Sequence, residues 1–97
     1  MHQNSRHTLN LRSTRFQNLS DLQNEVELIL DKFLRSFLLS NKAKPNLFII
    51  VGRGLNSTTF IKGKNPLRFY TENYLDKVGL VWKDNLLNPG IIEVYLE

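Results

Sequence analysis

The spacing of hydrophobic positions changes along the chain and predicts an alternation of strands and helices. HTLNLR at 7–12 alternates polar and apolar residues, as a strand with one buried face does. Residues 19–40 carry apolar side chains at helical spacing behind Ser20, a favourable N-cap, with acidic residues in the first turns. LFIIV at 47–51 is apolar throughout and predicts a central strand.

A second helix is predicted to begin at Asn65 and Pro66, because Asn is a good N-cap and Pro is favoured at the first helical position. Gly79 is expected to end this helix. Residues 80–83 are predicted to form a short strand, and residues 88–90 are predicted to form a turn. Ile92, Val94 and Leu96 alternate with other residues and predict a final strand. The predicted order is therefore βαβαββ. The side chains of the second helix that are expected to face inward are Leu67, Tyr70, Tyr74, Leu75 and Val78.

Strands joined through helices pair in parallel by right-handed crossovers, so the first three strands are expected to be parallel. In open sheets of this kind, ligands gather at the carboxyl ends of the strands. The first two strands end near Leu11 and Val51. If these strands are neighbours, Arg12 lies at the same edge of the sheet as Gly52, Arg53 and Gly54.

The composition fits one small domain, expected over residues 7–97, behind a disordered tail at 1–6. The 97 residues are 41% hydrophobic and 23% charged, as in ordinary soluble proteins. The absence of Cys excludes disulfides, thiol catalysis and cysteine-ligated zinc. No apolar run is long enough to span a membrane, and the polar start does not resemble a signal peptide. We therefore expect an intracellular, cytoplasmic protein without a membrane partner.

The positive charge is unevenly distributed along the chain. The net charge is +4, and residues 32–71 include eight Lys or Arg but no Asp or Glu. Such asymmetry indicates a polyanionic partner. The alternative is a solvated basic surface that has no partner.

The segment VGRGLNSTTFIKGKN at 51–65 concentrates glycine and basic residues between a strand and a helix. Glycines after a strand permit positive φ and let backbone N–H groups approach a phosphate, with an arginine as a further donor. The helix N-terminus that follows also favours an anion. The motif matches neither a dinucleotide fingerprint nor a P-loop, and a tight turn is the alternative role for its first glycines. The candidate phosphate-binding residues are Arg12, Gly52, Arg53, Gly54, Lys62, Lys64 and Arg68.

Groups for proton transfer or metal binding are scarce. The two histidines, His2 and His7, precede the first strand or begin it, away from its carboxyl end. Neither lies among carboxylates at a ligand spacing, so we predict no metal site and no cofactor.

Four segments together resemble the Smr (small MutS-related) domain: LNLR, IIVGRGLNS, NPLRFYTENYL and NPGIIEVYL. The resemblance covers roughly residues 7–97. It implies an α+β two-layer sandwich in which two helices cover one face of a four-stranded mixed sheet, with the last strand antiparallel to the others. It also implies a domain that nicks DNA or cleaves RNA, often within larger repair or ribosome-rescue proteins.

The two signatures of that family, LDxH and HGxG or TGxG, are altered here. Asn10 stands in place of the acid, Arg12 in place of the histidine, and Val51 in place of the His or Thr. Asn10 cannot act as a carboxylate base, and Arg12 remains protonated near neutral pH. Arg12 and Arg53 can still stabilise charge on a phosphate, so they are the candidate catalytic residues if the chain cleaves.

Three functional hypotheses follow from these features. The first is a domain that binds the phosphate backbone of RNA or DNA, and the second adds endonuclease activity at the same site. The third is a protein-interaction domain that docks on a ribosome or a repair complex, using the acidic first helix and the basic loop as a bipolar surface.

Overall fold

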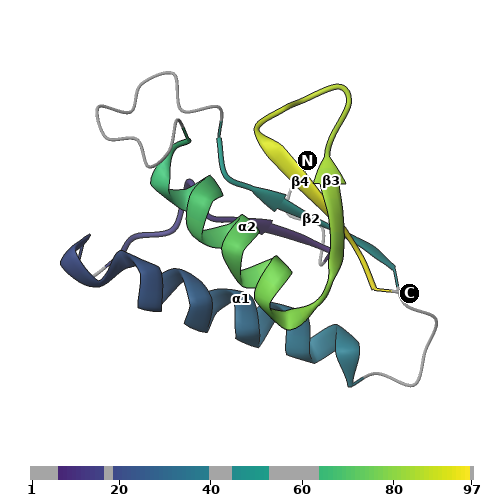
Figure 1. Ribbon diagram of the computed structural model, residues 1–97, viewed down its shortest axis with the longest axis horizontal. Helices are drawn as coiled ribbons and strands as arrows, with labels where there is room; N and C mark the ends of the chain where they lie inside the picture. Colours follow the sequence, from purple (N-terminus) through teal and green to yellow (C-terminus); the bar gives the residue numbers. More distant parts are fainter. Residues whose placement is uncertain (1–6, 17–18, 40–44, 53–63, 97) are drawn as a thin grey trace.

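The elements follow one another in the predicted order. The computed structural model describes residues 7–16, 19–39, 45–52 and 64–96. The predicted tail at 1–6 and the loop residues Arg53, Gly54 and Lys62 lie outside these ranges. The elements are β1 (Thr8–Asn10), the 3-10 turn η1 (Leu19–Asp21), α1 (Leu22–Leu38), β2 (Asn46–Ile50), α2 (Pro66–Val78), β3 (Val81–Asp84) and β4 (Ile91–Tyr95) (Figure 1).

The strands form one mixed sheet in the order β1-β2-β4-β3. β1 and β2 are parallel, and β4 is antiparallel to both of its neighbours, β2 and β3. The first three strands therefore share one direction, as the helical connections predict. β4 lies between β2 and β3, and its inward side chains, Ile92 and Val94, are therefore fully buried. Val81 and Lys83 of β3 are exposed, as suits an edge strand.

Both helices cover the same face of the sheet, which makes a two-layer α+β sandwich (Figure 1). The sheet contributes inward residues that alternate along the central strands, and α1 adds one buried residue at each turn. α2 completes the core with Tyr74 and Leu75. The fully or nearly fully buried apolar side chains are Leu11, Val26, Leu30, Leu34, Leu47, Ile49, Val51, Tyr74, Leu75, Ile92 and Val94. The predicted fold class is confirmed.

The two helix starts differ in how well the sequence predicts them. α2 begins as expected: Asn65 Oδ1 accepts a hydrogen bond from the Arg68 backbone N–H at 2.9 Å, and Pro66 follows the cap. The prediction of Ser20 as the N-cap of α1 is wrong. The 3-10 turn moves the cap to Asp21, whose carboxylate accepts from the Asn24 side chain at 2.8 Å.

The prediction that Val78 of α2 faces inward is wrong, because this residue is 45% exposed. It lies in the last turn, next to Gly79, which ends the helix at a φ of +81°. Thr71 and Glu72 are buried instead. A buried carboxylate in this position requires cationic partners, which are described below.

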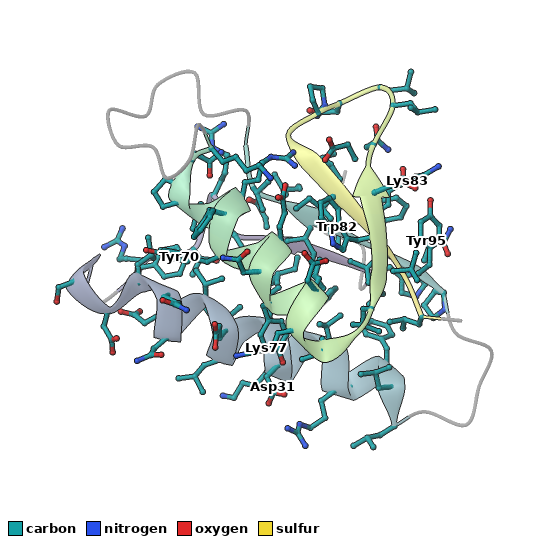
Figure 2. All side chains as sticks on the ribbon, viewed as in Figure 1. Asp31, Tyr70, Lys77, Trp82, Lys83 and Tyr95 are labelled. Carbon is teal, nitrogen blue, oxygen red and sulfur yellow. The ribbon has the colours of Figure 1, made fainter. Side chains whose placement is uncertain are left out.

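The other face of the sheet is not covered by either helix, and it carries aromatic side chains. Tyr95 donates to Glu93 at 2.9 Å, and the Lys83 ammonium lies 5.7 Å from the centre of the Tyr95 ring (Figure 2). On the helix side, Trp82 Nε1 donates to Asp76 at 2.8 Å. Trp82 and Tyr95 are thus sheet residues.

No helix in the described part of the chain is both long and apolar enough to cross a bilayer.

Tyr74 is expected to make the free energy of unfolding vary with pH in the alkaline range. The residue is 9% exposed, and its hydroxyl donates a hydrogen bond to Asp31 at 3.3 Å. Burial raises the pKa of Tyr74, and the negative charge of Asp31 raises it further. A tyrosine in the unfolded chain loses its proton near pH 10. Above that pH the folded chain holds the proton longer, so the free energy of unfolding falls as pH rises.

The Tyr74→Phe variant is therefore expected to lose less stability than wild type between about pH 9 and pH 11. Urea denaturation at several pH values measures the difference. A Tyr70→Phe variant controls for the loss of one tyrosine. Parallel stability curves for wild type and Tyr74→Phe would contradict the assignment.

Candidate functional site

The carboxyl ends of β1 and β2 meet at one edge of the sheet. Asn10 and Ile50 are partners in the register, and the Leu11 N–H donates to the Ile50 carbonyl at 3.0 Å. The chain leaves the sheet at Arg12 on one strand and at Gly52 on the other. The expectation that these two residues share an edge is confirmed.

The backbone of Gly52 is buried beneath the Arg12 side chain. Gly52 has a φ of +83°, a region that side chains other than glycine rarely adopt. A Cβ at this position would collide with Arg12 Cδ and lie 2.9 Å from Arg12 Nε. The backbone conformation therefore requires glycine, and a Cβ would in addition displace the Arg12 side chain. The positive φ that a glycine after this strand was expected to permit is present at Gly52.

The Gly52 amide is not available to an anion. Its N–H donates to the Gly90 carbonyl at 3.0 Å, and the Val51 N–H donates to the same oxygen at 2.9 Å. Gly90 belongs to the connection between β3 and β4. Gly52 thus joins that connection to the end of β2 by a backbone hydrogen bond, and the Arg12 side chain packs on Gly52.

Asn10 fixes the turn that presents Arg12. Its side-chain oxygen accepts from the Ser13 N–H at 3.1 Å. The Ser13 and Thr14 hydroxyls both donate to the Asn10 carbonyl, at 3.3 and 3.0 Å. The backbone on either side of Arg12 is therefore held, while the Arg12 side chain itself is exposed.

Asn65 ties the start of α2 to the same place. Its side chain is buried, accepts from the Arg68 N–H, and donates from Nδ2 to the Gly52 carbonyl at 3.2 Å. Arg12 and the N-terminus of α2 thus both adjoin the Gly52 turn. A helix N-terminus carries partial positive charge, which favours a negative ligand nearby.

Arg68 is a cross-link within the fold. Its guanidinium donates to Glu72 at 2.9 Å, to Asp84 at 2.7 Å, and to the Pro89 carbonyl. Burial disfavours the charge of Arg68, but the hydrogen bonds that Arg68 donates to Asp84 and Glu72 and the negative charges of these acids outweigh that effect, and the pKa of Arg68 is raised. A phosphate contact by Arg68 would require the loss of some of these bonds.

Lys64 is also paired, with the same Glu72 carboxylate. The side chains of Glu72 and Arg68 are only 8% and 13% exposed, whereas those of Lys64 and Asp84 are 45% and 57% exposed, so the centre of this network is buried and its two ends reach solvent. Two of the predicted phosphate-binding cations therefore face two acids, Glu72 and Asp84. The sequence held a partial signal of this arrangement, because Glu72 follows Arg68 by four residues on a helix.

Arg12 differs from these two cations. It makes no ion pair with any residue in the described ranges, and it is exposed at the strand ends. Among the predicted site residues that the structure describes, it is the one positioned to offer its charge to a ligand.

The described residues offer little for proton transfer at this edge. His7 precedes β1, at the opposite end of the strand, and its ring lies edge-on to Phe37 with the centroids 5.6 Å apart. No group of three or more His, Cys, Asp or Glu side chains within the described ranges could hold a metal ion. The arrangement therefore suits charge stabilisation and hydrogen bonding.

No protein-family model, no curated protein and no solved structure matches this chain. Its function is therefore inferred from its own residues.

Proposed function

We propose that the protein binds the phosphate backbone of a nucleic acid at the carboxyl ends of β1 and β2, with Arg12 as the primary contact. The observation that carries this proposal is the contrast among the cations at this edge. Lys64 and Arg68 are neutralised by acids, whereas the Arg12 side chain lies over Gly52 with no carboxylate partner in the described ranges. An arginine so placed can donate two hydrogen bonds to one phosphate.

A polymer fits better than a single phosphate compound because the chain as a whole has an excess of positive charge. The net charge is +4. Such a charge distribution attracts a polyanion and speeds its association. The resemblance to the Smr domain, in its middle and final segments, supports the same class of partner.

Binding without cleavage is the form of this function that we propose. At the position of the family's acid, the Asn10 oxygen is engaged by the Ser13 N–H. At the position of the histidine stands Arg12, and a guanidinium is not a proton-transfer group of the kind that an imidazole is. The site keeps groups that stabilise phosphate charge and lacks the groups that the family's signatures supply for proton transfer.

Fluorescence anisotropy with labelled single-stranded RNA, single-stranded DNA and duplex DNA tests the proposal. Between about 50 and 200 mM salt, each neutralised phosphate is expected to contribute about −0.9 to the log–log slope on duplex DNA and about −0.7 on single strands, so the Arg12 contact alone predicts a slope at least that steep. The same samples are then run on a denaturing gel, where intact strands are expected. A binding constant that does not change with salt would contradict phosphate recognition, and cut strands would contradict binding without cleavage.

A further inference from the structure

The connection between β3 and β4 presents two adjacent leucines to solvent. Leu86 and Leu87, together called the leucine tip here, are 89% and 93% exposed. They are more exposed than any other large hydrophobic side chain in the described ranges. Single exposed apolar residues are ordinary, but two adjacent ones at the end of a hairpin form a protruding apolar surface.

Hydrogen bonds hold the leucine tip in place. Asn85 Oδ1 accepts from the N–H groups of Leu87 and Asn88, at 2.9 and 2.8 Å. Asn88 Oδ1 accepts from the Gly90 N–H at 2.9 Å. The turn is therefore formed before any partner binds, which reduces the entropy lost on binding.

The leucine tip belongs to a connection that is attached to the candidate phosphate site. The Gly90 carbonyl accepts hydrogen bonds from the N–H groups of Val51 and Gly52, and the Arg68 guanidinium donates a hydrogen bond to the Pro89 carbonyl. A Cβ on Gly90 would lie 3.1 Å from the backbone of Gly52, the same residue on which Arg12 lies. Figure 1 shows the β3–β4 connection on the same side of the molecule as the end of β2. Arg12 and the connection that carries the leucine tip thus adjoin the same residue, Gly52.

We propose that the leucine tip is an apolar wedge that packs against unstacked bases of a nucleic acid whose backbone is held at Arg12. The inference rests on the proposed function and adds a structural preference to it. Phosphate contacts alone carry no information about the bases. Leucine is among the side chains that proteins insert between base steps, and insertion is easiest where stacking is already interrupted. The preferred ligand is therefore a duplex with a bulge or a similar interruption.

The test compares an intact duplex with one that differs only by a two-nucleotide bulge, in DNA and in RNA, with 2-aminopurine beside the bulge. The wild-type protein is expected to bind the bulged duplex about tenfold more tightly and to raise the 2-aminopurine fluorescence. The Leu86→Ala/Leu87→Ala variant is expected to lose both effects while keeping its affinity for the intact duplex within about twofold. The matched control is Leu28→Ala/Leu39→Ala, in α1 and at its C-cap, where the two residues are 67% and 75% exposed.

The control variant is expected to behave as wild type. Arg12→Ala is expected to weaken binding to both duplexes by a similar factor and to retain the preference for the bulge. If the Leu86→Ala/Leu87→Ala variant keeps the preference, or if wild type shows none, the wedge is refuted while phosphate binding stands. If no nucleic acid binds at all, the proposed function fails and the wedge fails with it.

Discussion

Replacing Arg12 with alanine is expected to weaken nucleic-acid binding by about 10- to 150-fold near 100 mM salt. The estimate reflects the loss of one charge-assisted, bidentate contact, which contributes about 1.5–3 kcal/mol. Loss of one phosphate contact also reduces the steepness of the salt dependence by about 0.9 in the log–log slope. Anisotropy titrations at several salt concentrations measure both quantities.

Two further variants separate charge from geometry at this position. Arg12→Lys keeps the charge but lacks the planar fork of donors, so it should retain the salt slope and only part of the affinity. Lys32→Ala removes an exposed cation from α1, on another part of the surface, and is expected to change affinity by less than about twofold. Equal effects of Arg12→Ala and Lys32→Ala would show that binding depends on total charge and not on a site.

The order of the elements could be predicted because burial in this small fold follows simple periods. Leu47 and Ile49 are buried in a continuous apolar run, and Asn65 with Pro66 marks the start of α2. The position of β4 between β2 and β3 does not follow from these local patterns. It depends on contacts between distant segments, such as the pairing of Ile49 with Ile92.

The charge pattern predicted the candidate site less well than the hydrophobic pattern predicted the fold. The acid-free stretch ends at Thr71, and the next residue, Glu72, folds back to pair with Lys64 and Arg68. Linear charge counts cannot show that an acid after the stretch neutralises cations within it. Asp84 joins Arg68 from a different strand, which no local spacing indicates. The leucine tip was also missed, because apolar residues are expected to be buried.

A second substitution is expected to act on the fold and not on the ligand. Arg68→Ala should lower the free energy of unfolding by about 2–4 kcal/mol, because it leaves the buried Glu72 carboxylate with Lys64 alone and removes the bond to Pro89. Urea denaturation followed by circular dichroism measures the change.

The chain contains a matched control for this substitution. Arg35 pairs with Asp31 at the same 2.9 Å distance and also four residues apart, but these side chains are 63% and 42% exposed. Solvent screens such a pair, so Arg35→Ala is expected to cost less than about 0.5 kcal/mol. If the two variants are destabilised equally, burial is not what makes the Arg68 pair important.

A double-mutant cycle identifies which part of the Arg68 network stabilises the fold. In an Arg68→Ala background, Glu72→Ala removes the carboxylate that the first change left with fewer partners. The double variant should therefore be more stable than the sum of the single effects predicts, by about 1–3 kcal/mol. Strictly additive effects would instead mean that Arg68 acts through packing and the Pro89 carbonyl. In either case, the folding of Arg68→Ala must be measured before a loss of nucleic-acid binding in this variant is assigned to a lost phosphate contact. Arg12, in contrast, is exposed and takes no part in the ion-pair network of the described residues, so a loss of binding in Arg12→Ala reports on the ligand.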